Sequence, residues 1–445
     1  MLKEAKKIHF IGIGGIGIST LAQMFNEQGK TITGSDIENT DHIEHMIEDG
    51  ISIYIGHDEK HVAQSHDLVI YSYAIEKDNP ELVKAKELNI PCLTYPEALG
   101  EFSKDYYTIG ITGTHGKSTT TSMVALLLEK AGYDPTVIVG TKIKEFDNKN
   151  YRIGKSKYLV VEACEFRNAF LHYKLDILAI INIDSDHLDF FKTQEAYIKA
   201  FNEACKRVEK TGLIILDADD KFSHDIEHGA SAQTFKISNE TLKDHSFHYE
   251  SGNKSDTLHL NPDVPGKFNI RNSAFAAVIG KFLGIENEKI EKAISEFKGS
   301  WRRMELKELH HLKHVKYYDD YGHLPAEIDV TLQAIREKYP TEKILAIFQP
   351  HQFIRIRNYL KEFGMCFGGA DDVLIPDILR NRDTPEEMAS IGTHELIAEI
   401  KKYKKNVFHS TDIENTADWL KEHGKNYTVM VAMGSGNIKK LYKLI

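Results

Sequence analysis

A glycine-rich turn between a predicted strand and a predicted helix carries the residues best suited to binding a nucleotide phosphate. The apolar run at residues 107–111 predicts a buried strand, and Lys117 and Ser118 open a segment of helical periodicity over residues 119–130. Glycines in the turn let backbone N–H groups face an anion, and the helix N-terminus adds its dipole. Lys117 is placed to reach the terminal phosphates, and the Ser118 hydroxyl can ligate Mg²⁺.

The spacing of this turn is tighter than in the standard phosphate loop, which has four residues between its first glycine and the Gly-Lys pair. Gly113 precedes Gly116 by three positions, in the sequence GTHGKS. The alternative interpretation is a strand-to-helix turn with an incidental lysine. We predict an ATP site, whose candidate residues are Gly113, Thr114, His115, Gly116, Lys117, Ser118 and Thr119.

An acidic residue and a histidine follow two further predicted strands. Residues 158–163 predict a buried strand that ends with Glu162, and residues 175–183 predict another, which leads to His187. Because parallel strands end at one edge of a sheet, Ser118, Glu162 and His187 can converge on one Mg²⁺-nucleotide site. Oxygen ligands suit Mg²⁺, whereas the imidazole suggests a second, softer metal position. The alternative for Glu162 is a strand-end carboxylate with a structural partner.

The N-terminal segment carries a second glycine-rich turn. Residues 8–13 predict a strand that leads into GIGGIG and a helix, and a second short strand ends at Asp36, about 20 positions further on. Taken alone, this is the dinucleotide fingerprint and indicates NAD. A Rossmann-like turn of this kind also suits any nucleotide diphosphate, so both interpretations stay open. The candidate residues are Gly14, Gly15, Ile16, Gly17, Asp36 and Ser72.

The last part of the chain and the stretch before it add candidate ligand contacts. Asn269 and Asn272 lie three positions apart at the start of a predicted helix, where their amides could pair with an adenine edge, or could cap the helix and face solvent. The alternating pattern beyond residue 301 implies a third open sheet. Arginines near its strand ends suit carboxylate or phosphate. The polar and charged residues singled out there are Arg303, Asp320, His323, His351 and Arg355.

Length and composition limit the class of protein. A chain of 445 residues exceeds one ordinary core and predicts about three domains. The formal net charge of −10 argues against non-specific nucleic-acid binding. The cysteines show neither metal spacing nor a disulfide framework, and no apolar run approaches the roughly 20 residues of a membrane span. We therefore expect a cytoplasmic protein without membrane partners.

Ten motifs occur in the order found in the Mur ligases, and this resemblance covers the whole chain. Within that family the chain most resembles the branch that adds L-alanine to UDP-N-acetylmuramate, and next the branch that recycles muramyl tripeptide. The phosphate loop marks only the superfamily, whereas the glycine-rich N-terminus, DDYGH and FQPH are more specific. The motifs are GIGGIGIS, TGSD, GTHGKSTTT, VVEACE, NIDSDHLD, PGKFNIRN, WRRME, DDYGHLPAE, FQPHQFIR and MGSGN.

The resemblance implies a three-domain α/β protein: a Rossmann-like UDP-binding domain at residues 1–104, a central phosphate-loop ATPase-type domain at 105–300, and a Rossmann-like amino-acid domain at 301–445. UDP rather than NAD would then occupy the Gly14–Gly17 turn, and a monomer or weak homodimer would act on ATP, UDP-N-acetylmuramate and L-alanine. Lys117 would stabilise the transferring phosphate, which forms an acyl phosphate that the amine attacks.

The resemblance also assigns roles to single residues. Ser118 and Glu162 would hold one Mg²⁺, and His187 with Glu162 a second. The asparagine pair would read adenine, while Arg303 and Asp320 would meet phosphate and ribose. The residues expected to face the amino acid and the reacting carboxylate are His323, His351 and Arg355.

The chain departs from the family pattern at several positions, two of which, Leu324 and Gln352, adjoin the expected amino-acid pocket. Phe268 and Leu324 stand where histidines are usual, and Gln352 where an arginine is usual. Asn202 aligns with a lysine that many relatives outside the alanine-adding branch carbamylate, which favours the alanine-adding branch. The departures near the amino-acid pocket keep the tripeptide acceptor, and a non-catalytic nucleotide-binding homologue, as alternatives. A nicotinamide oxidoreductase is a further alternative.

Overall fold

The computed structural model describes residues 2–184, 188–226, 232–252, 254–380 and 383–445. It divides into two compact units, Met1–Leu260 with Asn272–Ile294, and Asn261–Arg271 with Ser295–Ile445. Helices alternate with mostly parallel strands throughout, so the predicted α/β class is confirmed. No helix among the described residues is long and apolar enough to cross a membrane.

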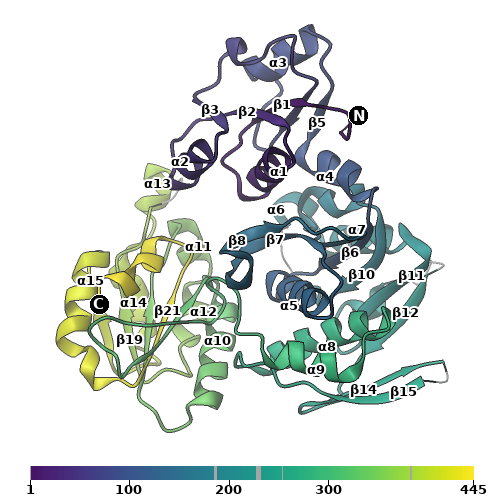
Figure 1. Ribbon diagram of the computed structural model, residues 1–445. Coiled ribbons are helices and arrows are strands. Elements are labelled where there is room, and N and C mark those ends of the chain that lie inside the picture. The colour runs from purple at the N-terminus through teal and green to yellow at the C-terminus, as the bar shows by residue number, and fades with distance from the viewer. Residues whose placement is uncertain (1, 185–187, 227–231, 253, 381–382) are drawn as a thin grey trace. The chain divides into compact units, whose positions relative to one another are not determined.

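The N-terminal part of the first unit is a five-stranded parallel sheet in the order β3-β2-β1-β4-β5. Side chains alternate between its faces, so Ile8 and Phe10 pack in one apolar cluster and Ile11 in another. Helices α1 and α3 cover opposite faces (Figure 1). The elements are β1 (Lys7–Ile11), α1 (Ile16–Glu27), β2 (Thr31–Asp36), α2 (Asp41–Glu48), β3 (Ser52–Ile55), η1 (Glu59–His61), β4 (Leu68–Tyr71), α3 (Pro80–Glu87), β5 (Cys92–Thr94) and α4 (Tyr95–Ser103).

The rest of the first unit is built on a seven-stranded sheet in the order β12-β11-β10-β6-β9-β7-β8, in which only the edge strand β8 runs antiparallel. Strand β10 is buried along its whole length, as expected of a parallel strand covered on both faces. The elements are β6 (Tyr107–Thr112), α5 (Lys117–Lys130), β7 (Thr136–Ile143), η2 (Lys144–Phe146), β8 (Lys149–Arg152), β9 (Tyr158–Glu162), η3 (Phe166–His172), β10 (Leu175–Ile180), α6 (Leu188–Phe191), α7 (Gln194–Cys205), β11 (Val208–Asp217), η4 (Ser223–Asp225), β12 (Gln233–Ile237), α8 (Lys267–Phe282) and α9 (Asn287–Ser295).

The polar segment after β12 forms a small antiparallel sheet. Its strands are β13 (Leu242–Lys243), β14 (Ser246–Ser251) and β15 (Lys254–His259). In β14, Phe247 and Tyr249 are buried while His248 between them is exposed. Alternate side chains of this strand are therefore buried and exposed. The high average polarity of the segment hides this alternation in the sequence.

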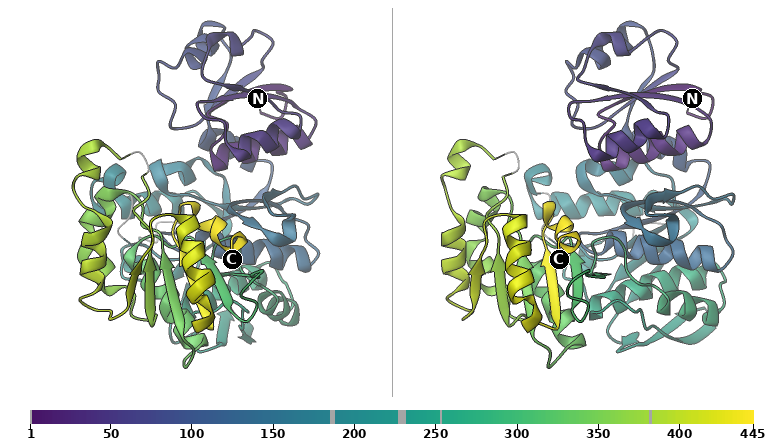
Figure 2. Two further views of the ribbon diagram at one scale, coloured as in Figure 1. Left: turned by 90° about the vertical axis from the view of Figure 1, so that its left-hand side faces the viewer. Right: turned by 60° about the vertical axis from the view of Figure 1, so that its left-hand side comes forward.

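The second unit contains a six-stranded sheet in the order β16-β17-β21-β18-β19-β20, with β16 antiparallel at one edge. Helices pack on both of its faces (Figure 2). Residues of β18 alternate between an apolar cluster on one face and a second cluster on the other. The elements are β16 (Glu305–Lys307), β17 (Lys316–Asp320), α10 (Pro325–Lys338), β18 (Ile344–Phe348), α11 (Phe353–Asn358), α12 (Leu360–Met365), β19 (Asp372–Ile375), α13 (Pro385–Met388), α14 (Thr393–Ile400), β20 (Val407–His409), α15 (Ile413–His423), η5 (Gly424–Asn426), β21 (Val429–Met433) and η6 (Asn437–Lys443).

In each of the three large sheets a glycine-rich or polar loop leaves a strand next to the point where the strand order reverses. These are the loops after β1, after β6, and after β18 and β21. Crevices at such points are the usual ligand sites of open α/β sheets. The loops at these points are therefore candidate ligand sites, and they are the same loops that the sequence predicts to bind ligands.

Candidate functional site

The phosphate loop connects β6 to α5 and depends on glycine at two positions. Gly113 has φ 129°, and Gly116, the N-cap of α5, has φ 82°. A Cβ on Gly113 would lie 2.7 Å from the carbonyl oxygen of Asn182, and one on Gly116 would lie 2.9 Å from the side-chain oxygen of Asn272. Both the backbone conformation and the space available therefore require glycine.

Asn182, just beyond β10, anchors the loop. Its side-chain oxygen accepts the backbone N–H of His115 at 2.8 Å, and its amide nitrogen donates to the carbonyl of His115 at 2.9 Å. Its own carbonyl accepts the backbone N–H of Thr114 at 3.1 Å. These three bonds hold the middle of the loop to the neighbouring strand end, so the loop is pre-organised before a ligand binds.

Lys117 is buried beside the loop and is charged. Its Nζ donates to the carbonyls of Gly113, at 2.5 Å, and Thr114, at 3.1 Å, and lies 3.0 Å from Oε1 of Glu165. Burial is the largest single effect and disfavours the ammonium, but the fully buried Glu165, together with Cys164 and Glu162, outweighs burial, so the pKa of Lys117 is raised above its usual value. A positive charge is thus fixed at the mouth of the phosphate loop.

A buried tyrosine joins this lysine site to the loop. Tyr197 Oη lies 3.3 Å from Oγ1 of Thr114 and 3.3 Å from Oε1 of Glu165. Thr114 Oγ1 also accepts the backbone N–H of Asp184 at 2.8 Å. The loop, the lysine and its carboxylate partner therefore belong to one hydrogen-bonded network.

The predicted metal ligands are described only in part. Ser118 lies in the first turn of α5 and is 7% exposed. Glu162 ends β9, where one carboxylate oxygen accepts the backbone N–H of Gly140 at 2.7 Å. A Cβ on Gly140 would lie 2.9 Å from both carboxylate oxygens, so the missing side chain makes room for the carboxylate. His187 lies outside the described residues.

The donors present fit Mg²⁺, because a hydroxyl and a carboxylate supply the oxygen ligands that this ion prefers. Over the described ranges, no group of three or more His, Cys, Asp or Glu side chains is arranged to hold a metal. The magnesium assignment for Ser118, Glu162 and His187 thus stays a prediction.

The predicted adenine residues lie in the first turns of α8. Asn269 and Asn272 are each 3% exposed, and Asn269 donates from its amide nitrogen to the carbonyl of Pro265 at 2.7 Å. Asn272 lies against Gly116 of the phosphate loop. The alternative in which one of these asparagines faces solvent is therefore excluded, because helix α8 packs both positions inward.

The N-terminal glycine turn is held by the end of β2. Oδ2 of Asp36 accepts the backbone N–H of Gly14 at 2.8 Å. A Cβ on Gly17 would meet the ring of Tyr95 at 2.8 Å, so only glycine allows helix α1 to start here. Ile16 is 62% exposed at the turn.

The other predicted members of this turn lie with it. Gly15 is exposed and is the N-cap of α1. Ser72 follows β4, and its Cβ would lie 3.1 Å from a Cβ placed on Gly12, which has φ 75°. The turn thus lies between the ends of β2 and β4, as predicted for a nucleotide-binding Rossmann-like sheet.

In the second unit, adjacent arginines and aspartates have different partners. Arg302, 1% exposed, pairs with Asp319, its Nε lying 3.1 Å from Oδ1, and also donates to the carbonyl of Gly434. Asp320 accepts the backbone N–H groups of Met304, at 2.8 Å, and Gly322, at 2.7 Å. Burial raises the pKa of Asp320, and the charge of Arg303 opposes that rise. Arg302 and Asp319 therefore connect the loop that carries Arg303 to the end of β17, where Asp320 lies.

His323 and His351 lie together, with ring centroids 5.3 Å apart. Arg355 Nη1 donates to Nε2 of His351 at 2.6 Å, and Ser435 Oγ lies 2.9 Å from the same nitrogen. Burial, with the neighbouring Arg355 charge, lowers the pKa of His351 to about 3. Burial also lowers the pKa of His323, although Glu327 opposes this. Two neutral imidazoles and one guanidinium thus form a compact cationic group.

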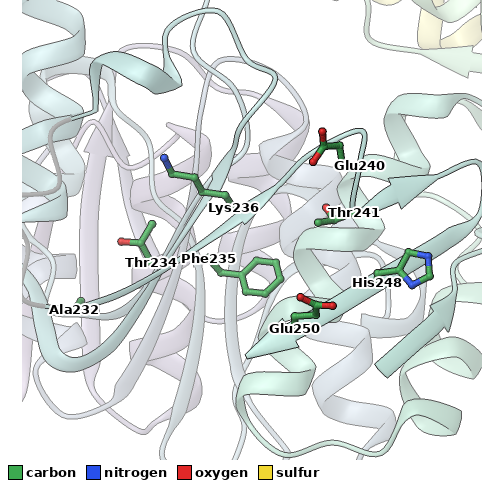
Figure 3. A pocket seen from close by; sticks show the side chains of 8 residues that line it. All are labelled: Ala232, Thr234, Phe235, Lys236, Glu240, Thr241, His248 and Glu250. Carbon is green, nitrogen blue, oxygen red and sulfur yellow. The ribbon is translucent and has the colours of Figure 1, made fainter. Parts of the chain in front are cut away.

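A separate pocket of about 710 Å³ lies between β12 and the small antiparallel sheet. Figure 3 shows its charged and polar side chains around the ring of Phe235, which stacks on Tyr249 at a centroid distance of 5.1 Å. None of the predicted site residues lines it. We assign it no part in the chemistry.

Comparison with known proteins identifies the family. Three family models match in succession: "Mur ligase family, catalytic domain" at residues 7–107, "Mur ligase middle domain" at 111–280, and "Mur ligase, glutamate ligase domain" at 302–436. The chain belongs to the Mur ligase family. As a member of it, the protein is an ATP-dependent ligase that forms amide bonds.

Similar proteins cover this Mur ligase almost completely. UDP-N-acetylmuramate–L-alanine ligases from Caldanaerobacter subterraneus subsp. tengcongensis and Caldicellulosiruptor bescii are 38% and 36% identical to it, over 98% and 99% of this chain and 96% and 98% of theirs. The crystal structure of UDP-N-acetylmuramate-alanine ligase from Thermotoga maritima matches with a TM-score of 0.79 at 26% identity, over 98% of this chain and 97% of that one. A murein peptide ligase from Psychrobacter arcticus shares the fold, with a TM-score of 0.68 at 21% identity over 98% and 97% of the chains.

Several contacts of this Mur ligase site were not predicted from its sequence. Glu165 and Asn182 each stand just beyond a buried strand, and this position is the signal that could have identified them. Tyr197, Arg302 and Ser435 carry no comparable local signal, because their partners lie far away along the chain.

Proposed function

We propose that this Mur ligase joins L-alanine to the carboxylate of UDP-N-acetylmuramate at the expense of ATP, in the synthesis of peptidoglycan precursors. The observation that carries the proposal is the full-length identity to UDP-N-acetylmuramate–L-alanine ligases, 38% over 98% of this chain. The charged, buried Lys117 in the phosphate loop supports it, because it is the group that such a reaction needs.

In the proposed reaction the substrate carboxylate attacks the γ-phosphate of ATP, and ADP leaves. The backbone N–H groups of the phosphate loop and the Lys117 ammonium stabilise the charge on the transferring phosphoryl group. Ser118 and Glu162, with His187, would hold Mg²⁺, which when bound offsets phosphate charge. The neutral amine of L-alanine then attacks the acyl phosphate, and the tetrahedral intermediate expels phosphate.

Specific residues would bind each substrate. The turn at Gly14, Gly15, Ile16 and Gly17, with Asp36 and Ser72, would hold the diphosphate and ribose of the UDP-sugar. Asn269 and Asn272 would contact adenine, and Arg303 and Asp320 the ATP phosphate and ribose. His323, His351 and Arg355 would face L-alanine; the guanidinium of Arg355 suits the amino-acid carboxylate, because it presents paired donors.

The deciding experiment measures phosphate release from ATP with UDP-N-acetylmuramate and Mg²⁺, with single amino acids and the L-Ala-γ-D-Glu-diaminopimelate tripeptide as acceptors. Release that depends on L-alanine supports the proposal. Release only with the tripeptide would replace it with the recycling ligase, an alternative raised by Leu324 and Gln352 beside the amino-acid residues. No release with any acceptor would refute both.

We further propose that the enzyme works in the cytoplasm as a monomer or weak homodimer and as three domains, at residues 1–104, 105–300 and 301–445. Its partners would be small molecules, and neither nucleic acid nor membrane. The net charge of −10 supports the absence of nucleic-acid partners, and the scattered cysteines support the cytoplasmic location. Sedimentation of the purified protein at several concentrations tests the oligomeric state.

A further inference from the structure

A buried carboxylate lies behind the N-terminal glycine turn, and none of the steps above uses it. Glu81 is fully buried in the first turn of α3, whose N-cap is Asn79. Its Oε2 accepts the hydroxyl of Ser35 at 2.5 Å and lies 2.9 Å from Nδ1 of His57. Its Oε1 lies 2.6 Å from Nδ1 of His61.

The Glu81 carboxylate is ionised at every pH at which the protein would be studied. Burial alone would raise its pKa, but interactions with His9, Ser35 and His61 outweigh burial and lower the pKa to about 2. An ionised carboxylate is only an acceptor, so Nδ1 of His57 and of His61 must carry the protons of these contacts. A buried charge supported by several donors fixes the positions of those donors, because each lost bond leaves the charge less compensated.

This fixed charge connects directly to the glycine turn through Ser35. The Ser35 carbonyl accepts the backbone N–H groups of Gly12, at 2.8 Å, and Ile13, at 3.0 Å. The next residue, Asp36, accepts the N–H of Gly14 at 2.8 Å. The end of β2 therefore orients three successive amides of the turn, and Glu81 holds that strand end from behind through the Ser35 hydroxyl.

We infer that Glu81 is a positioning residue for the nucleoside-diphosphate site: through Ser35 it fixes the glycine turn that binds the diphosphate. This inference rests on the proposed function, which places the UDP-sugar at that turn. Glu81 itself does not touch the substrate. Its effect is to pre-organise the turn: the bonds that Gly12, Ile13 and Gly14 donate to the end of β2 fix the backbone that follows, so that binding does not have to order it.

The test is Glu81→Gln, which keeps the shape of the side chain and removes its charge. We expect the Kd for UDP and for UDP-N-acetylmuramate, measured by titration calorimetry, to rise by about tenfold alike, because both ligands share the diphosphate. The KM for ATP and the kcat at saturating UDP-sugar should stay within twofold of the unchanged protein. Glu87→Gln, an exposed change on the same helix, is the matched control and should leave all four values unchanged.

Ser35→Ala removes the link, together with the contact of the hydroxyl to Nδ1 of His57, while keeping the Glu81 charge, and provides the test if Glu81→Gln does not fold. A similar rise in both Kd values supports the inference. Unchanged Kd values in the folded variant, or an equal loss of ATP affinity, would overturn it. If the unchanged protein binds neither UDP nor the UDP-sugar, the proposed function fails instead, so the two failures are distinguishable.

Discussion

Lys117 and Glu165 form a buried ion pair at the phosphate loop, with Nζ and Oε1 3.0 Å apart. Glu165 is fully buried and Lys117 has 15% of its side chain exposed. Removing one member of a buried pair leaves an uncompensated charge, which is far more damaging than losing an exposed pair. Both residues are therefore sensitive positions, for different reasons.

Lys117→Ala should abolish product formation and leave binding of the UDP-sugar nearly intact. The ammonium is the side-chain cation proposed to stabilise the transferring phosphoryl group, whereas the UDP-sugar would bind at the N-terminal turn. We expect phosphate release to fall at least about a thousandfold, by analogy with the loss of other phosphate-stabilising cations. Release assays and UDP-N-acetylmuramate titration measure the two effects. Unchanged turnover would contradict the assignment of the loop.

Glu165→Gln should make activity sensitive to alkaline pH. Glu165 raises the pKa of Lys117, and without its charge the effect of burial, which lowers that pKa, is opposed less strongly. The ammonium is then lost as pH rises, at a lower pH than in the unchanged enzyme. The kcat between pH 7 and 10 should begin to fall at least about one pH unit earlier. Glu145→Gln, at an exposed glutamate of the same sheet region, should keep the original profile.

Asn182→Asp should weaken ATP binding selectively. The carboxylate can still accept the N–H of His115 but can no longer donate to its carbonyl, and two oxygens would then face each other. Losing this bond and leaving a carbonyl unsatisfied costs about 1–3 kcal/mol, which corresponds to a rise in the KM for ATP of roughly fivefold to a hundredfold. Asn358→Asp, at an exposed position, is the control. Equal KM values for the two variants would contradict the anchoring role.

The order of strands and helices can be predicted well from the sequence because it depends on short-range patterns of apolar residues and glycines. Buried strands such as β10 are largely apolar runs, and the phosphate loop carries Gly113 and Gly116, whose positive φ and close neighbours exclude a side chain. The sequence does not reveal the small sheet after β12, because its alternation is short and its average polarity high.

The partners of the site residues are harder to predict. Neighbouring residues of the same type can have different partners. Arg302 is buried against Asp319, whereas the charge of Arg303 acts on Asp320. Only the direction in which each side chain leaves the backbone separates them. Likewise, Tyr197 contacts Thr114 from 83 positions away in the sequence, and no local sequence pattern predicts a contact over that separation.

Gly140→Ala should raise the Mg²⁺ concentration needed for half-maximal activity. The new Cβ would lie 2.9 Å from both oxygens of Glu162, so the proposed metal ligand would have to move. We expect a shift of several-fold with little change in the KM for the UDP-sugar, since a ligand displaced by a few tenths of an ångström binds its ion less well. Gly368→Ala, where an added Cβ meets nothing within 4 Å, is the matched control. Identical Mg²⁺ curves for both variants would remove Glu162 from the proposed ligand set.

His351 should make the protein less stable in acid, in a way that His351→Gln removes. Its pKa is about 3 in the folded chain against an ordinary value of 6.5 in the unfolded chain. Between these values the unfolded chain binds more protons, so stability is fully present above pH 6.5 and is lost as pH falls. At pH 5 the loss from this residue is roughly 2 kcal/mol. Urea unfolding at pH 7 and pH 5 should therefore show a smaller decline for His351→Gln than for the unchanged protein.

The matched control for that experiment is His314→Gln, because His314 is exposed. It should decline with pH as the unchanged protein does. If His351→Gln declines equally, the imidazole is not held neutral, and its acceptance of a hydrogen bond from Arg355 Nη1 would be wrong. That bond needs an unprotonated Nε2. The pH dependence therefore tests both the contact between His351 and Arg355 and the charge of the site proposed to bind L-alanine.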